Sequence, residues 1–192
     1  MQALHHRGGS VCNDFPNHTL LKMTQHEQGP RYLMHWDHQC DQRLLRDVVS
    51  TTHRLAELPI FSDEGLALLL DRYPAEALVV TTMGQNPAHT SELQYGAFDQ
   101  FEGREWIEVI RRGRLCLRLT DVTKHSEELA EIVRRLSSEM MECQPGLHTD
   151  SHAGDLWITS PYTIHYFGID REPNVFWQIR GHRKISHYPL SE

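Results

Sequence analysis

The spacing of apolar residues predicts several helices in the first two thirds of the chain. Apolar side chains recur three and four positions apart, and proline or glycine follows the last turn. Two of these helices also follow a serine that can cap the first turn. The predicted helices are the segment from Ser62 to Pro74, residues 102–112 before Gly113, and the segment from Ser126 to Pro145.

Alternating apolar and polar residues predict strands, most of them in the last third. Segments 77–83 and 115–120 are predicted strands that precede the last helix. Helices first and antiparallel strands last are typical of the α+β class, with a sheet built mainly near the C-terminal end. The predicted strands after that helix are Leu156–Ser160, Tyr162–Ile169, Val175–Arg180 and Ile185–Tyr188.

The composition divides the chain into two parts. A length of 192 residues is enough for one domain with a substantial core. Residues 1–40 hold six of the 14 histidines, show little periodicity, and carry as many basic as acidic residues. The net charge of −7 therefore comes entirely from residues 41–192. We expect a His-rich, poorly ordered segment over 1–40 and a single domain over 41–192.

Charge and motifs exclude several classes of function. An acidic chain repels phosphate backbones, and its basic cluster at 111–114 is short, so nucleic-acid binding is not expected. Apolar runs are too short for a membrane span, and the first residues show no secretory signal. The four cysteines form no C-x-x-C pair, which indicates reduced thiols in a cytoplasmic protein. Motifs of phosphate-binding loops, dinucleotide-binding folds, α/β-hydrolases and zinc proteases are absent from the sequence.

Residues 160–184 form the most distinctive block of the sequence. They read Ser-Pro-Tyr-Thr-Ile-His-Tyr-Phe-Gly-Ile-Asp-Arg-Glu-Pro-Asn-Val-Phe-Trp-Gln-Ile-Arg-Gly-His-Arg-Lys. The order and spacing of these residues resemble the JmjC-like, cupin-like branch of the Fe(II)/2-oxoglutarate-dependent dioxygenases, and a weaker likeness extends over roughly residues 50–190. The resemblance implies N-terminal helices that flank the first part of a cupin-like double-stranded β-helix, a relative of the jelly roll.

The resemblance also implies cofactors and site residues. In this family two histidines and one carboxylate hold Fe(II) on one face, which leaves positions for 2-oxoglutarate and oxygen. The metal carboxylate corresponds to Asp170, and the family's asparagine and glutamine correspond to Asn174 and Gln178. The basic residue that receives the distal carboxylate of 2-oxoglutarate corresponds to Arg183, or to Lys184 if the register shifts by one position. The implied substrates are proteins or small molecules.

Two departures from the family pattern concern the metal ligands. Gly168 stands where the family has the first histidine of His-x-Asp, and glycine offers no side-chain donor. His165 does not replace it, because in a regular strand without a bulge its side chain points away from the face of Asp170. The family's second histidine comes from a late strand, and only His182 and His187 follow Asp170 here. We therefore expect that catalysis has been lost and name no catalytic residue.

One other cluster has the spacing of metal ligands within the predicted domain. His148, Asp150 and His152 form a literal His-x-Asp-x-His in a predicted loop, where they form either a metal site or a polar turn. A further His-x-x-His-x-Cys run at residues 35–40 belongs to the weakly patterned N-terminal segment.

Two classes of function agree with these observations. The first is a non-haem iron hydroxylase that uses 2-oxoglutarate. The second is a non-catalytic cupin-like module that binds another molecule or a second copy of the chain, as a homodimer. The count of metal ligands favours the second class for this polypeptide.

Overall fold

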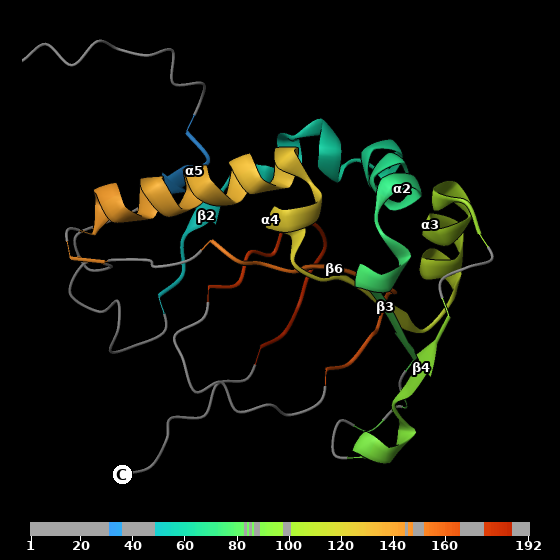
Figure 1. Ribbon diagram of the computed structural model, residues 1–192. Helices are drawn as coiled ribbons and strands as arrows, with labels where there is room; N and C mark the ends of the chain where they lie inside the picture. The colour runs from blue at the N-terminus through green and yellow to red at the C-terminus, as the bar shows by residue number, and fades with distance from the viewer. Residues whose placement is uncertain are drawn as a thin grey trace, which may run out of the picture.

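The structure is a computed structural model, and it describes residues 31–35, 49–82, 84, 86, 89–97, 101–144, 146–147, 152–165 and 175–185. These parts form an α+β fold in which helices lie along one side of an antiparallel sheet (Figure 1). The sheet has four strands in the order β4-β3-β5-β6, and β1 pairs with β2 separately. The α+β class predicted from the sequence is confirmed.

The elements carry the labels of Figure 1, and their bounds are as follows. The strands are β1 (Leu33–His35), β2 (Thr52–His53), β3 (Leu78–Thr82), β4 (Gln94–Gly96), β5 (Leu115–Leu119) and β6 (Leu156–Thr159). The helices are α2 (Asp63–Arg72), α3 (Gly103–Arg112), α4 (Val122–His125) and α5 (Glu127–Cys143). Among the residues described, no helix is long and apolar enough to cross a membrane.

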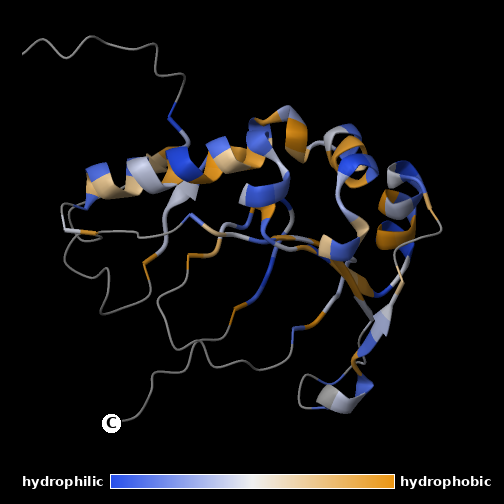
Figure 2. Cartoon of the chain, in the orientation of Figure 1, coloured by the Kyte–Doolittle hydropathy of each residue, from blue (hydrophilic) through white to orange (hydrophobic). Residues whose placement is uncertain are grey.

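The helices begin and end close to the predicted positions because their caps are encoded locally. Ser62 Oγ accepts a hydrogen bond from the Gly65 N–H at 3.0 Å, and Ser126 Oγ accepts one from the Leu129 N–H at 3.3 Å. Each bond satisfies a backbone donor that the first turn leaves unpaired. Figure 2 shows apolar and polar residues alternating around α2, α3 and α5, as expected for helices with one buried face.

The sheet register gives the two faces of the sheet different environments. Thr81 of β3 lies opposite Cys116 of β5, and Cys116 lies opposite Thr159 of β6. Directly opposed residues share a face, and successive residues of a strand alternate between faces. Leu117 therefore belongs to the other face, where it is fully buried in the core formed with the helices. The Cys116 face lies on the side away from that core.

Two predicted strands differ in the structure. Residues 162–165 form a turn and an irregular segment, and residues 175–180 pair with no strand in the described part of the chain. Trp177 packs edge-on against His53 with ring centroids 5.7 Å apart, and Arg180 donates to the carbonyl of Phe61 at 3.0 Å. The alternation here arises because every second side chain is partly buried against the domain. It does not reflect a ladder of backbone hydrogen bonds to another described strand. Positions 166–169 and 186–188 lie outside the described residues.

Residues 31–35 of the predicted N-terminal segment are part of the packed domain. They include β1, which pairs with β2, and Leu33 is 6% exposed within the core. The backbone N–H of Leu33 donates to Oε2 of Glu139 on α5 at 2.7 Å. These contacts tie this part of the N-terminal segment to the middle of the chain. Residues 1–30 and 36–40 lie outside the described residues.

Candidate functional site

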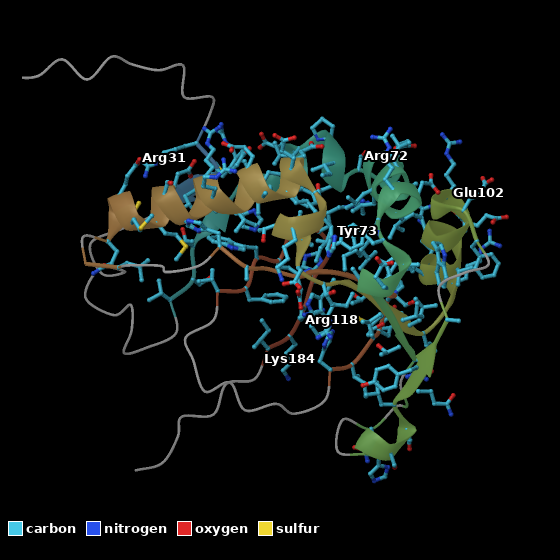
Figure 3. The ribbon with its side chains drawn as sticks, in the orientation of Figure 1. Arg31, Arg72, Tyr73, Glu102, Arg118 and Lys184 are labelled. Carbon is cyan, nitrogen blue, oxygen red and sulfur yellow. The ribbon has the colours of Figure 1, made fainter. Side chains whose placement is uncertain are left out.

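The Cys116 face of the sheet carries a group of polar and aromatic side chains. Thr81, Cys116 and Arg118 lie on it by the register of β3 and β5, and Trp157 of β6 lies opposite Arg118. The C-terminal segments 161–165 and 175–185 contribute the remaining members. Arg118 and Lys184 lie below the sheet in Figure 3, on the side away from α2 and α5. We call this group the sheet-face cluster; it comprises Thr81, Cys116, Arg118, Trp157, His165, Phe176 and Arg183.

The cluster is held together by a continuous series of contacts. The guanidinium carbon of Arg118 lies 5.6 Å from the centroid of the Trp157 ring, and that ring lies 4.9 Å from the ring of His165. Arg183 donates a hydrogen bond to Nε2 of His165 at 2.9 Å. Its guanidinium carbon also lies 4.9 Å from the centroid of the Phe176 ring. Each of the two arginines therefore makes a cation–π contact that stabilises its position, Arg118 with Trp157 and Arg183 with Phe176.

The hydrogen bond between Arg183 and His165 determines the protonation state of the imidazole. A guanidinium group has donors and no acceptor, so Nε2 of His165 accepts, and its proton resides on Nδ1. Burial, and then the positive charge of Arg183, lower the pKa of His165 below its ordinary value of 6.5. Both causes favour the neutral ring that the hydrogen bond requires.

The electrostatic balance of the cluster is positive. Burial raises the pKa of the Cys116 thiol, so the thiol is uncharged. The positive charges of Arg183 and Arg118 act in the opposite direction on this pKa, which places both guanidinium groups near the thiol. Arg118 has Asp155 as its carboxylate, at an Nε–Oδ2 distance of 3.9 Å. Arg183 forms no ion pair with any residue that the structure describes.

The environment of Arg183 is unusual for this protein. Burial is the main cause that lowers the pKa of Arg183, since removing a guanidinium from water disfavours its charged form. Other arginines of the described chain, such as Arg111 and Arg180, share a carboxylate, that of Asp63. A half-buried guanidinium without such a partner favours an anion from outside the chain.

The residues predicted from the family resemblance are placed in part. Arg183 belongs to the sheet-face cluster, and its neighbour Lys184 is exposed. Gln178 is exposed, and its amide donates to the carbonyl of Arg180 at 2.5 Å. Asp170 and Asn174 lie outside the described residues, as does Gly168. The structure thus brings together one predicted binding residue and a set of neighbours that the resemblance did not name.

The exclusion of His165 from the site depended on a regular strand over residues 162–169, of which the structure describes residues 162–165. Residues 162–165 are not a strand, so the alternation of faces does not apply to them. Sequence reasoning also missed Arg118 and Trp157. A signal was present for Arg118, since the apolar residues at 115, 117 and 119 place it on the opposite face of β5.

The alternative metal clusters are described only in part. His152 is exposed, and His148 and Asp150 lie outside the described residues, as do His38 and Cys40. Within the described ranges, no group of three or more His, Cys, Asp or Glu side chains is arranged to hold a metal ion.

Ser160 fixes the position at which the C-terminal segment leaves the sheet. Its hydroxyl donates to the carbonyl of Ile110 at 2.5 Å and accepts from the N–H of Leu115 at 3.0 Å. Its own N–H donates to the carbonyl of Leu115 at 2.9 Å. Ser160 is 3% exposed, so these bonds are shielded from water. They hold the start of the turn that leads to His165.

The turn after Ser160 contains a strained tyrosine, which leads to a stability prediction. Tyr162 has φ of 61° and is 94% exposed, and the N–H of Thr163 donates to the Ser160 carbonyl at 3.3 Å. A positive φ after proline is typical of a type II turn, which favours glycine at this position. We expect Tyr162→Gly to stabilise the protein by about 0.5 kcal/mol, the relief of strain less the added freedom of the unfolded chain.

Urea unfolding of the two proteins measures this gain. Tyr162→Ala is the matched control because it removes the ring and keeps the strain, and it should give no gain. An equal gain in both variants would show that the exposed ring, and not the backbone, is the cause.

Comparison of the chain with protein-family models, with curated proteins and with solved structures finds no match.

Proposed function

We propose that this chain is a non-catalytic cupin-like domain that binds 2-oxoglutarate or a similar small carboxylate at the sheet-face cluster. The observation that carries the proposal is Arg183, a half-buried guanidinium with no ion-pair partner among the described residues, at the position where the family resemblance expects the 2-oxoglutarate-binding base. Guanidinium groups bind carboxylates through two parallel hydrogen bonds, so Arg183 suits such a ligand. Arg118 supplies a second positive charge on the same face.

The proposal also includes the fold that the resemblance to the dioxygenase family implies. The four-stranded sheet would be part of a double-stranded β-helix, and the segment after Ser160 would continue it. Its support is the order of residues in the block 160–184 together with the placement of Arg183 over one face of the sheet.

The residues do not fit an iron centre of the family type. Gly168 has no side-chain donor, and of the ligands that the resemblance implies only Asp170 is present in the sequence. Loss of a ligand also removes the orientation that it gives to the others, with a cost in metal affinity of typically 10–100-fold. We therefore assign no reaction step to a bound metal and expect binding without turnover.

Isothermal titration with 2-oxoglutarate tests the proposal. Arg183→Ala should weaken binding at least about tenfold, because a hydrogen-bonded charge contributes about 1.5–3 kcal/mol. Arg112→Ala is the matched control, since the Arg112 side chain is 83% exposed on α3 and away from the cluster. Its affinity should equal that of the wild type.

Three results would each overturn a different part of the proposal. Absence of 2-oxoglutarate binding to the wild type at millimolar concentration would remove the binding function, and equal affinity in Arg183→Ala would show that the ligand does not bind at the sheet-face cluster. Iron-dependent release of succinate above a metal-free control would show that the domain is an enzyme.

A further inference from the structure

The hydrogen bond between Arg183 and His165 exists only while His165 is neutral. Nε2 of His165 is the acceptor, at 2.9 Å from a guanidinium nitrogen. A second proton on the ring would occupy this nitrogen, remove the acceptor and place two positive groups in contact. In the absence of a ligand, protonation of His165 would therefore break this hydrogen bond and make the contact between the two side chains repulsive.

Among the described residues, the groups around His165 provide no charge to compensate such a proton. From the 175–185 segment it faces Arg183, and from β6 it faces the uncharged ring of Trp157. Beyond these lie Arg118 and the neutral Cys116 thiol of β5. The nearest acidic group in this chain of contacts is Asp155, which lies beside Arg118 and accepts from the N–H of Asp121 at 3.0 Å.

A bound anion would supply the missing charge. An anion oxygen placed between the two side chains can accept from the Arg183 guanidinium and from a protonated Nε2 of His165 at once. In that arrangement the imidazolium has a partner, and the repulsion between the two cations is offset by the negative charge between them.

We propose that an anion enters the sheet-face cluster together with one proton, which His165 takes up at Nε2. The proton comes from the solvent, and the Arg183 N–H exchanges its acceptor from His165 to the anion. This inference rests on the proposed function and specifies its regulation: the site binds its carboxylate ligand more tightly in acid.

The direction of the pH dependence follows from linkage. The pKa of His165 is below 6.5 in the free protein, and a bound anion raises it because an opposite charge favours the protonated ring. Between the two pKa values, binding takes up a proton, so affinity increases as the pH falls. An opposite charge in contact shifts a pKa by about 1–3 units, and each unit corresponds to about tenfold in affinity.

Titration of the wild type with 2-oxoglutarate at pH 6.0 and pH 8.0 tests the linkage, because the ligand's carboxylates stay ionised over this range. We expect tighter binding at the lower pH, by up to about tenfold for each unit by which the bound anion raises the pKa of His165. Repeating the titration in buffers of different ionisation enthalpy should show net proton uptake at pH 6.0. The ring resonances of His165 should give a higher pKa with ligand than without it.

His165→Gln is the informative variant, since its amide oxygen can accept from Arg183 but cannot take up a proton. We expect it to bind 2-oxoglutarate with an affinity that is nearly independent of pH. His182→Gln, at an exposed position of the 175–185 segment, should keep the pH dependence of the wild type.

The outcomes separate the linkage from the proposed function. Binding of equal strength at both pH values without proton uptake, or an unchanged pH dependence in His165→Gln, would overturn the linkage alone. Absence of binding at both pH values would overturn the proposed function and the linkage together.

Discussion

Replacing Gly103 by alanine is expected to destabilise the protein by about 3 kcal/mol, because the added methyl group would overlap the backbone of a neighbouring helix. Gly103 is the first residue of α3, and its N–H donates to Oδ1 of Asp71 in α2 at 2.7 Å. A Cβ atom at this position would overlap the carbonyl oxygen of Ala67 and lie 2.8 Å from its carbonyl carbon. Figure 1 shows α2 and α3 side by side.

The overlap cannot be relieved by rotating a side chain. Both atoms belong to the main chain of α2, so the two helices would have to move apart. Their separation would loosen the contacts of Trp106 and Leu70, which are 4% and 2% exposed in the core. Overpacking of this kind costs typically 1–3 kcal/mol, and rigid neighbours place it at the upper end.

Gly154→Ala provides the matched control. A Cβ at Gly154 would lie 3.9 Å from methyl groups of Val122 and Val133, which is ordinary van der Waals contact. This variant should unfold at or slightly above the urea concentration of the wild type, since alanine restricts the unfolded chain. A loss of less than about 0.5 kcal/mol for Gly103→Ala would contradict the close packing of α2 and α3.

The helices could be predicted because their signals lie within a few residues of one another. Ser62 and Ser126 each cap a helix through an N–H three positions further along the chain. Apolar residues at helical spacing then identify the buried face. Such local information survives in a single sequence, so the bounds of α2 and α5 agree with the prediction.

The segment 175–180 shows why strands are harder to predict. Its alternation is real, since Trp177 and Ile179 are partly buried and Phe176 is exposed. A strand also needs a neighbour with free backbone groups, and alternation does not reveal one. What holds this segment is contact with distant residues, among them an ion pair from Arg180 to Asp63 at 2.8 Å.

The candidate site, like the fold, could be predicted from the sequence only in part. The family resemblance selected Arg183 from the order of residues, and this could be done from sequence. Its hydrogen bond to His165 could not, because the two belong to separate segments whose approach depends on the folded chain. The placements of Asp170 and Asn174 remain predictions.

The net charge illustrates a further limit of sequence composition. A chain with a net charge of −7 suggests a surface that repels anions. The sheet-face cluster nevertheless places Arg118 and Arg183 near the same thiol, with Asp155 at the edge of ion-pair distance from one of them. Local geometry therefore decides which charge a ligand meets, because a bound group responds mainly to charges within a few ångströms.

Removing the carboxylate of Glu139 tests how residues 31–35 are attached to the domain. Glu139 is 4% exposed, and its carboxylate accepts hydrogen bonds from the backbone N–H groups of Tyr32, at 2.9 and 3.0 Å, and Leu33, at 2.7 Å. Arg135 donates to the same carboxylate at 3.2 Å. One buried side chain therefore holds two backbone donors of a segment more than a hundred residues away in sequence.

Glu139→Gln should reduce the free energy of unfolding by about 3 kcal/mol. The amide has nearly the same size, but its NH₂ group would face backbone donors in place of an acceptor, and a hydrogen bond to a charged group contributes about 1.5–3 kcal/mol. Urea unfolding measures the loss, and hydrogen exchange at the Tyr32 and Leu33 amides should become faster.

Glu142→Gln is the control. The Glu142 side chain is 57% exposed and pairs only with Arg31 among the described residues, so a loss of at most about 1 kcal/mol is expected. Equal losses in the two variants would mean that the Glu139 carboxylate does not anchor this segment.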